Sequence, residues 1–381
     1  VGLALYVPMA RGGTSTLDPG PGRTHLRYAN VQPIHTSLAA SYAWKELFGF
    51  GASLTWIHST WAARIDNQSA TSFRDYPGLG NFLAGELDGA SIEDPDLLVA
   101  TDFGPLIDDV FSFQAGLYAK PHPEVALSVA WVHGAAVRHE GPVTMDFGCP
   151  DPQEYPLLGG PLGAPAFGVC DARMRGESAV GYRYPMRLHA GVAWLPSEHN
   201  RLELMGGWVR WSQYTDFDIT VSNVESENTE ITPEVADLLS LQRRWARANR
   251  DTFWLALDGK VQAHEQIVVG GRITFDHAAV PDEVMSPNNA DFDTLRLGAL
   301  VAATPSKKVP IRLSLSYLGD VQFRRTVRDN RFRVDVDPEA RVEDRYMYPT
   351  MNGEYRGWLH RIGLTVGGDF DVQRKRARPT P

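Results

Sequence analysis

Apolar and polar residues alternate one by one along much of this 381-residue chain. From Ile311 to Phe323 the apolar side chains fall on alternate positions, while serine, glutamine, aspartate and arginine fill most positions between them. A period of two predicts a β-strand with one apolar and one polar face. The pattern predicts about twelve strands, with further examples beginning at Ile34, Phe50, Phe111, Val125, Tyr182, Phe253, Ile267, Leu295 and Trp358.

The connections between these strands alternate in length. Tight connections lie near residues 45–46, 121–123, 196–200, 264–265 and 305–308. Short turns at one end of a sheet and long loops at the other are typical of outer-membrane barrels. A soluble β-sandwich also alternates, but several strands here are long enough to cross a bilayer at a tilt of about 45°. We therefore predict an all-β transmembrane antiparallel β-barrel over residues 1–372, followed by a basic tail over 373–381.

Three local features modify this simple pattern. The apolar set shifts from even to odd positions between Trp208 and Trp211, which predicts a bulge near Val209 and Arg210. Two loop segments, 78–89 and 232–245, carry apolar residues at helical spacing and predict short helices. Aromatic residues cluster toward strand ends, where membrane interfaces would place them, and they include Tyr42, Trp44, Trp56, Trp61, Trp194 and Trp208.

The composition of the chain excludes several classes of function. The chain is 43% hydrophobic, but no run approaches the roughly 20 apolar residues of a spanning helix, which excludes a helical membrane protein. The net charge is −9 with mixed signs, so nucleic acid is not an expected partner. No nucleophile elbow, phosphate loop or histidine metal spacing is present, and we expect neither an enzyme nor a cofactor. An acidic stretch from Asp88 to Asp109 would bind Ca²⁺ or simply be solvated.

The only cysteines, Cys149 and Cys170, lie in one segment rich in glycine and proline. In an oxidising compartment they would form a disulfide that closes a loop of about twenty residues and stabilises it by roughly 3 kcal/mol. The sequence starts at Val1 without a methionine or a signal segment. Because an exported protein needs such a signal, we expect further residues to precede Val1.

Several segments resemble the FadL/TodX family of outer-membrane transporters of long-chain fatty acids and hydrocarbons. The resemblance is strongest over residues 184–194, 208–214, 250–259 and 275–283, and it extends to residues 76–85, which resemble the family's helical third loop. The family has a fourteen-stranded barrel plugged by an N-terminal hatch. On that template about twelve strands are present here, the hatch and first two strands are missing, and we expect a monomer in the Gram-negative outer membrane.

The resemblance also implies a route and its residues. In the family a hydrophobic ligand lodges in a loop groove, moves to a pocket in the lumen and leaves sideways through a gap in the barrel wall. The gap falls at Pro8, Met9 and Ala10, where a proline without an N–H interrupts the sheet. The groove falls on loop residues Tyr76, Leu79, Phe82, Leu83, Leu87, Leu157, Leu158, Leu162 and Phe167.

Inward positions of the alternation supply candidates for the lumen itself, namely Arg210, Trp254 and Arg272. An arginine there would pair with the carboxylate of a fatty acid, although a polar network within the wall is the simpler interpretation. The expected function is transport of a hydrophobic small molecule, with membrane lipid and lipopolysaccharide as surroundings. A structural or adhesin-like barrel and a general diffusion porin are the alternatives.

Overall fold

The computed structural model describes residues 1–6, 11–15, 27–45, 47–68, 98–148, 153, 172–197, 199–227, 236, 240, 242–285, 290–305, 311–328, 330 and 352–368. Only the backbone is described for residues 11–15, 67, 68, 98 and 242–246. Among the described residues, no helix is long and apolar enough to cross a membrane.

The described chain is built almost entirely from strands. In chain order they are β1 (Gly2–Tyr6), β2 (Arg11–Ser15), β3 (Tyr28–Trp44), β4 (Phe48–Gln68), β5 (Leu98–His122), β6 (Val125–Val132), β7 (Ala136–Phe147), β8 (Arg173–Arg183), β9 (Arg187–Ser197), β10 (Asn200–Val209), β11 (Asp216–Ser226), β12 (Gln242–Ala246), β13 (Thr252–His264), β14 (Ile267–Asp276), β15 (Thr294–Ala303), β16 (Ile311–Val327) and β17 (Gly353–Gly368). Two short 3₁₀ helices, η2 (Trp211–Gln213) and η3 (Asp282–Val284), lie between strands.

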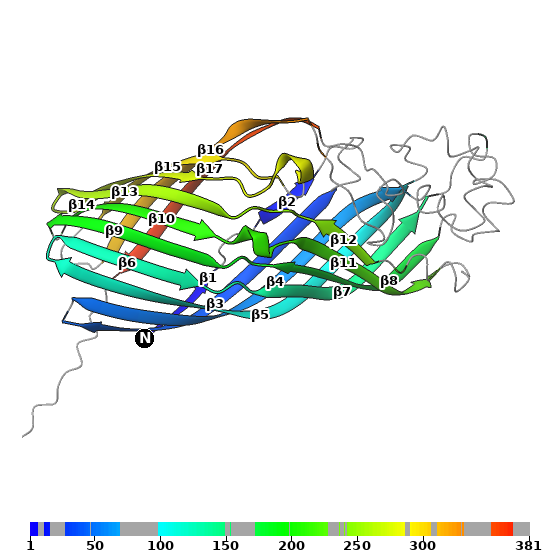
Figure 1. Cartoon of the computed structure of the whole chain (residues 1–381), viewed down its shortest axis with the longest axis horizontal. Helices are drawn as coiled ribbons and strands as arrows, with labels where there is room; N and C mark the ends of the chain where they lie inside the picture. The colour runs from blue at the N-terminus through cyan, green and yellow to red at the C-terminus, as the bar shows by residue number, and fades with distance from the viewer. Residues whose placement is uncertain are drawn as a thin grey trace, which may run out of the picture.

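These seventeen strands form one antiparallel sheet in which neighbours in space are mostly neighbours in sequence. Five pairs are halves of one longer strand. Both halves of β1/β2 pair with β3 and both halves of β6/β7 pair with β5, while the halves of the other three pairs follow the two halves of the split strand beside them. The sheet therefore contains twelve spanning strands: β1/β2, β3, β4, β5, β6/β7, β8/β9, β10/β11, β12/β13, β14, β15, β16 and β17. Within the described residues no register pairs β17 with β1 or β2. The tilted strands curve into a barrel wall, with the tight hairpins at one end (Figure 1). The predicted antiparallel β-barrel is confirmed.

The end of the barrel with the tight hairpins has an apolar outer surface. Along β16 the outward side chains of Ile311, Leu315 and Phe323 are 37–55% exposed, whereas Ser314 and Ser316 face the interior. The stretch from Ile311 to Phe323 is about 40 Å long and spans roughly 28 Å at a tilt of 45°. This height matches the apolar band of outer-membrane barrels, about 25 Å. We call this region the membrane half.

The opposite end reverses the polarity of the two faces. On β11 the inward residues Phe217, Ile219 and Val221 are at most 8% exposed, while Asp216 and Asp218 occupy the outer face. Strands β4, β5, β7, β8 and β11 all contribute to this apolar core, whose buried members are Trp61, Ala63, Ile65, Val99, Phe103, Leu106, Val143, Met145, Phe147, Ala172, Met174, Val180, Phe217, Ile219, Val221 and Val224. Apolar residues inside and polar residues outside suit a surface in water. We call this region the outer half.

Four adjacent spanning strands are interrupted where the polarity reverses. The interruptions are residues 133–135, 184–186, 210–215 and 247–251. Backbone hydrogen bonds still link them: the Tyr184 N–H donates to the Ala135 carbonyl at 2.8 Å, and the Arg210 N–H donates to the Met186 carbonyl at 2.9 Å. The interruptions therefore lie side by side and divide the membrane half from the outer half.

This reversal explains the shift of the apolar set near Trp208. Trp208 faces outward in the membrane half, and Phe217 faces the core of the outer half. Odd positions face inward in both β10 and β11, so the interruption, which contains η2, does not exchange the faces of the strand as a bulge would. The prediction that Trp61 lies in an interfacial girdle is also wrong, because its side chain is 6% exposed and lies within the apolar core.

The helix predicted over 232–245 is only partly correct. The Ser240 N–H donates to the Ala236 carbonyl at 3.0 Å, as in a helical turn. Residues 242–246, however, form β12, which pairs along the edge of β11. The open hydrogen-bonding edge of β11 satisfies these backbone groups better than a solvated helix end does. The helix predicted over 78–89 lies outside the described residues.

Candidate transport lumen

The inner wall of the membrane half is polar on β13 to β17. One row of inward cross-strand neighbours runs Asp258, Arg272, Gly298, Leu318 and Arg361. Arg272 is half-buried, and its Nε donates to the Thr274 hydroxyl at 3.2 Å. Among the described residues Arg272 has no carboxylate partner. Of the predicted lumen residues, Arg272 therefore has the geometry to receive an anionic group.

A network of charges joins Arg361 of this row to Asp320 and Arg296 of the next row. The Asp320 carboxylate accepts hydrogen bonds from Arg296 Nε at 2.7 Å and from Arg361 Nη2 at 2.9 Å. Asp320 is buried, and its two arginines come from the strands on either side of β16. With a further bond from Arg296 Nη2 at 3.2 Å, three charge-assisted hydrogen bonds hold this carboxylate between the two arginines. The sequence predicted a polar wall network as the simpler role of Arg210 and Arg272, whereas this network is formed by Arg296, Asp320 and Arg361 and does not include Arg272.

Trp254 lies flat along the inner wall. Its indole covers Gly207 on β10, where an added Cβ would come within 2.5 Å of Cε2 and 2.9 Å of Cζ2. On the far side of Gly207, the His189 ring centre is 5.5 Å from that of Trp254. The absence of a side chain at Gly207 thus creates the space for the indole. The sequence predicted that Trp254 faces inward but gave no sign of this packing.

Arg210 is placed differently from the other lumen candidates. It follows β10 directly, precedes η2 and is exposed. Even-numbered residues of β10 face outward, so Arg210 continues the outward row of Trp208 at the strand interruption. The described inner wall is therefore formed without Arg210.

A buried polar layer borders the apolar core above the lumen. His139 is fully buried; its Nε2 is 2.9 Å from the Ser59 hydroxyl and its ring stacks on Tyr182 at 5.5 Å. His139 Nδ1 has no hydrogen-bond partner among the described residues. Burial lowers the pKa of His139 to about 4, against a smaller opposing effect of Asp108. Sequence reasoning missed this layer, and the one signal was a histidine among the inward apolar residues of β7.

The predicted wall gap is framed by described residues. Tyr6 pairs with His35 and Arg11 pairs with Val31, so four residues on one side face three on the other. The three include Pro33, which is buried and has no N–H to donate. The predicted gap residues Pro8, Met9 and Ala10 themselves lie outside the described residues, as do all nine groove residues, Cys149 and Cys170.

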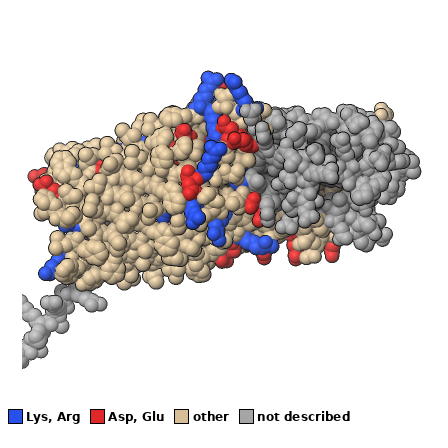
Figure 2. Space-filling view, in the orientation of Figure 1, with Lys and Arg blue, Asp and Glu red and all other residues tan. Residues whose placement is uncertain are grey.

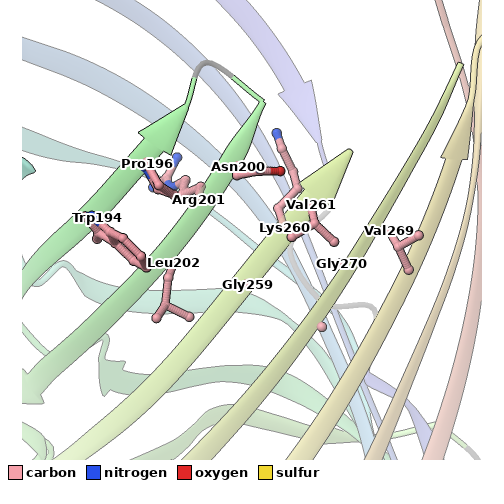
Figure 3. A pocket seen from close by; sticks show the side chains of 11 residues that line it. Trp194, Pro196, Asn200, Arg201, Leu202, Gly259, Lys260, Val261, Val269 and Gly270 are labelled. Carbon is pink, nitrogen blue, oxygen red and sulfur yellow. The ribbon is translucent and has the colours of Figure 1, made fainter. Parts of the chain in front are cut away.

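The outer wall carries one shallow apolar pocket near the tight hairpins. Trp194, Leu202, Val261 and Val269 surround it, and Gly259, paired with Gly271, forms part of its floor (Figure 3). These four side chains belong to the outward row of the membrane half. The pocket therefore faces lipid and is separate from the lumen.

Comparison with known proteins supports the fold. No family model and no curated protein matches the sequence. Among solved structures, a Pseudomonas aeruginosa FadL homologue is similar with a TM-score of 0.63 and 14% identity over 96% of this chain and 72% of that chain. The Pseudomonas putida toluene transporter TodX gives 0.60 and 12% over 85% and 74%. The Ralstonia pickettii toluene transporter TbuX gives 0.54 and 14% over 85% and 72%. The chain thus has the fold of the FadL/TodX family, an outer-membrane antiparallel β-barrel.

Proposed function

We propose that this protein transports hydrophobic compounds, either long-chain fatty acids or aromatic hydrocarbons, across the outer membrane. The observation that carries the proposal is the apolar interior of the outer half, in which Leu106, Met174 and Val180 are fully buried. A general diffusion porin instead keeps a polar, water-filled interior. An apolar interior in a FadL/TodX-type barrel favours apolar cargo and disfavours hydrophilic diffusion.

The proposed route begins in the loops and ends in the bilayer. Cargo would first lodge in a groove formed by residues 76–87 of one loop and residues 157–167 of the next, and would then enter the lumen. It would leave sideways between β1/β2 and β3, where Pro8 and Pro33 both lack the N–H that a complete ladder requires. Lateral release keeps apolar cargo out of water, which is worth about 25 cal/mol per Å² of buried surface.

Arg272 separates the two classes of cargo within this proposal. Its guanidinium has no carboxylate partner within the described part of the wall and would bind the head group of a fatty acid, whereas a hydrocarbon has no such group. We expect Arg272→Gln to slow uptake of a radiolabelled fatty acid about tenfold and to leave toluene uptake unchanged. An equal effect on both compounds would rule out head-group recognition by Arg272.

The central test measures uptake of fatty acid and toluene in cells that carry or lack the full-length gene. Uptake that depends on the gene supports the transport proposal, and equal uptake in both strains would contradict it. Purified full-length protein in a planar bilayer supplies an independent measurement. A large, steady ion conductance would contradict the proposal and identify a diffusion porin. A barrel that neither conducts ions nor supports uptake would favour a structural or adhesin-like role.

Two further features of the route are open to direct test. If backbone interruption creates the exit, Pro8→Ala combined with Pro33→Ala should slow release of cargo into the bilayer, because both ladder donors are restored. Unchanged uptake would show that the prolines do not create the exit.

Mass spectrometry without reductant should find a peptide cross-linked through Cys149 and Cys170, and two free thiols would disprove the loop disulfide.

A further inference from the structure

Three exposed arginines lie at the strand interruptions. Arg183 ends β8, Arg210 follows β10 and Arg250 precedes β13. Among the described residues none of the three guanidinium groups has a hydrogen-bond or ion-pair partner. Several other exposed arginines are paired, as Arg138 is with Glu140 at 2.8 Å, but Arg328 and Arg356 likewise have no partner among the described residues. The three arginines are distinguished by lying at interruptions of neighbouring strands.

The three arginines belong to one patch. Their strands are adjacent, because β9 pairs with β10 and β10 pairs with β13. The interruptions touch: the Arg210 N–H donates to the Met186 carbonyl, and the Ser212 N–H donates to the Asp251 carboxylate at 2.9 Å. Since neighbouring strands lie about 4.8 Å apart, the patch is roughly 10 Å wide across the strands, and Arg183, three residues beyond Met186, extends it by roughly 10 Å along them.

An apolar row lies directly on the membrane side of this patch. Leu188, Trp208 and Phe253 are cross-strand neighbours, and they are 36–56% exposed on the outer face. Arg210 stands two residues beyond Trp208, and Arg250 stands three residues before Phe253. Lys, Arg, Asp and Glu side chains form a belt across the middle of the molecule, beside a surface of the membrane half that carries few charges outside its hairpin end (Figure 2). The patch thus occupies the boundary between lipid and water on the loop side.

We infer that Arg183, Arg210 and Arg250 bind the phosphate groups of lipopolysaccharide in the outer leaflet, with its acyl chains packed on Leu188, Trp208 and Phe253. Guanidinium groups bind phosphate through paired, charge-assisted hydrogen bonds. A cluster of basic side chains next to an apolar face is the arrangement that recognises anionic lipid head groups. The Asp251 carboxylate, which accepts the Ser212 N–H, offsets one of the three positive charges, so these four side chains carry a net charge of +2. The inference depends on the barrel fold and not on the identity of the cargo.

The test uses full-length protein in detergent and measures binding of labelled lipopolysaccharide. We expect the triple variant Arg183→Gln/Arg210→Gln/Arg250→Gln to bind about tenfold more weakly than the wild type. The matched control is Lys45→Gln/Lys260→Gln/Arg312→Gln, which removes the same charge near the tight hairpins and should bind normally. Heat-modifiable migration in gels verifies that all variants are folded barrels.

A second arm separates phosphate recognition from general adhesion of lipid. Dephosphorylated lipid A should bind the wild type about as weakly as intact lipopolysaccharide binds the triple variant. Equal binding by wild type and triple variant would overturn the inference, as would equal loss in the control variant. Undiminished binding of dephosphorylated lipid A would also overturn it. Uptake of cargo is measured in a separate experiment, so a negative result for lipopolysaccharide binding would not contradict the transport proposal.

Discussion

Leu204 offers a direct test of the polarity reversal between the two halves of the barrel. It faces outward on β10, is 46% exposed and has Val192 and Leu257 as cross-strand neighbours. Four residues separate it from Trp208 at the boundary, which places it roughly 9 Å inside the apolar band. A band about 28 Å high has its midplane near 14 Å, so Leu204 lies about 5 Å from the midplane.

An arginine at position 204 would therefore be nearly as costly as one at the midplane. Charged residues on the lipid face destabilise barrels by about 2–4 kcal/mol at the midplane and by about 0–1 kcal/mol near the interfaces. We expect Leu204→Arg to lower the free energy of unfolding by about 2–3 kcal/mol. Its matched control is Ser222→Arg, on the outward and exposed face of β11 in the outer half. That change should stay within about 0.5 kcal/mol of the wild type.

The assay is reversible unfolding of the barrel in guanidinium with lipid vesicles, followed by tryptophan fluorescence. The denaturation slopes of wild type and both variants must agree before the unfolding free energies are compared. Equal destabilisation by Leu204→Arg and Ser222→Arg would refute the division into a membrane half and an outer half. A larger destabilisation by Ser222→Arg than by Leu204→Arg would also refute this division.

Three other predictions concern the interior. Gly207→Ala should force the Trp254 indole off the wall, lower stability by about 1–3 kcal/mol and shift tryptophan fluorescence. Gly271→Ala should do neither, because its added Cβ would meet only the Gly298 carbonyl oxygen at 3.8 Å; identical spectra of the two variants would contradict the packing. The pKa of His139 is lowered to about 4 in the folded protein. As pH falls, the unfolded chain therefore takes up a proton at this residue before the folded chain does, and stability is lost between about pH 6.5 and 4. Between pH 7 and 5 the loss should be about 2 kcal/mol, and His139→Gln should abolish that part of the pH dependence in unfolding measurements; an unaltered pH dependence would show that His139 is not its source. Asp320→Asn should cost about 1–3 kcal/mol in the same unfolding assay, because two wall arginines lose their shared carboxylate, and a neutral result would show that they do not need it.

The alternation of residues by itself determined much of this protein. Side chains on a strand point to opposite faces, so period-two stretches such as 311–323 identify strands without any knowledge of their neighbours. Strand length and the contrast between short and long connections then predicted the barrel. Inward placement of Trp254 and Arg272 followed from the same parity, and both lie on the inner wall.

Alternation cannot state which of the two faces meets lipid, and only the tertiary structure decided that. Trp56 faces outward in the membrane half, while Trp61, five residues along the same strand, is buried in the core of the outer half. The apolar face is the outer one where lipid surrounds the barrel and the inner one where water does, so the assignment depends on height in the membrane. Contacts such as Asp320 with Arg296 and Arg361 depend in addition on the register between strands, which a linear sequence does not contain.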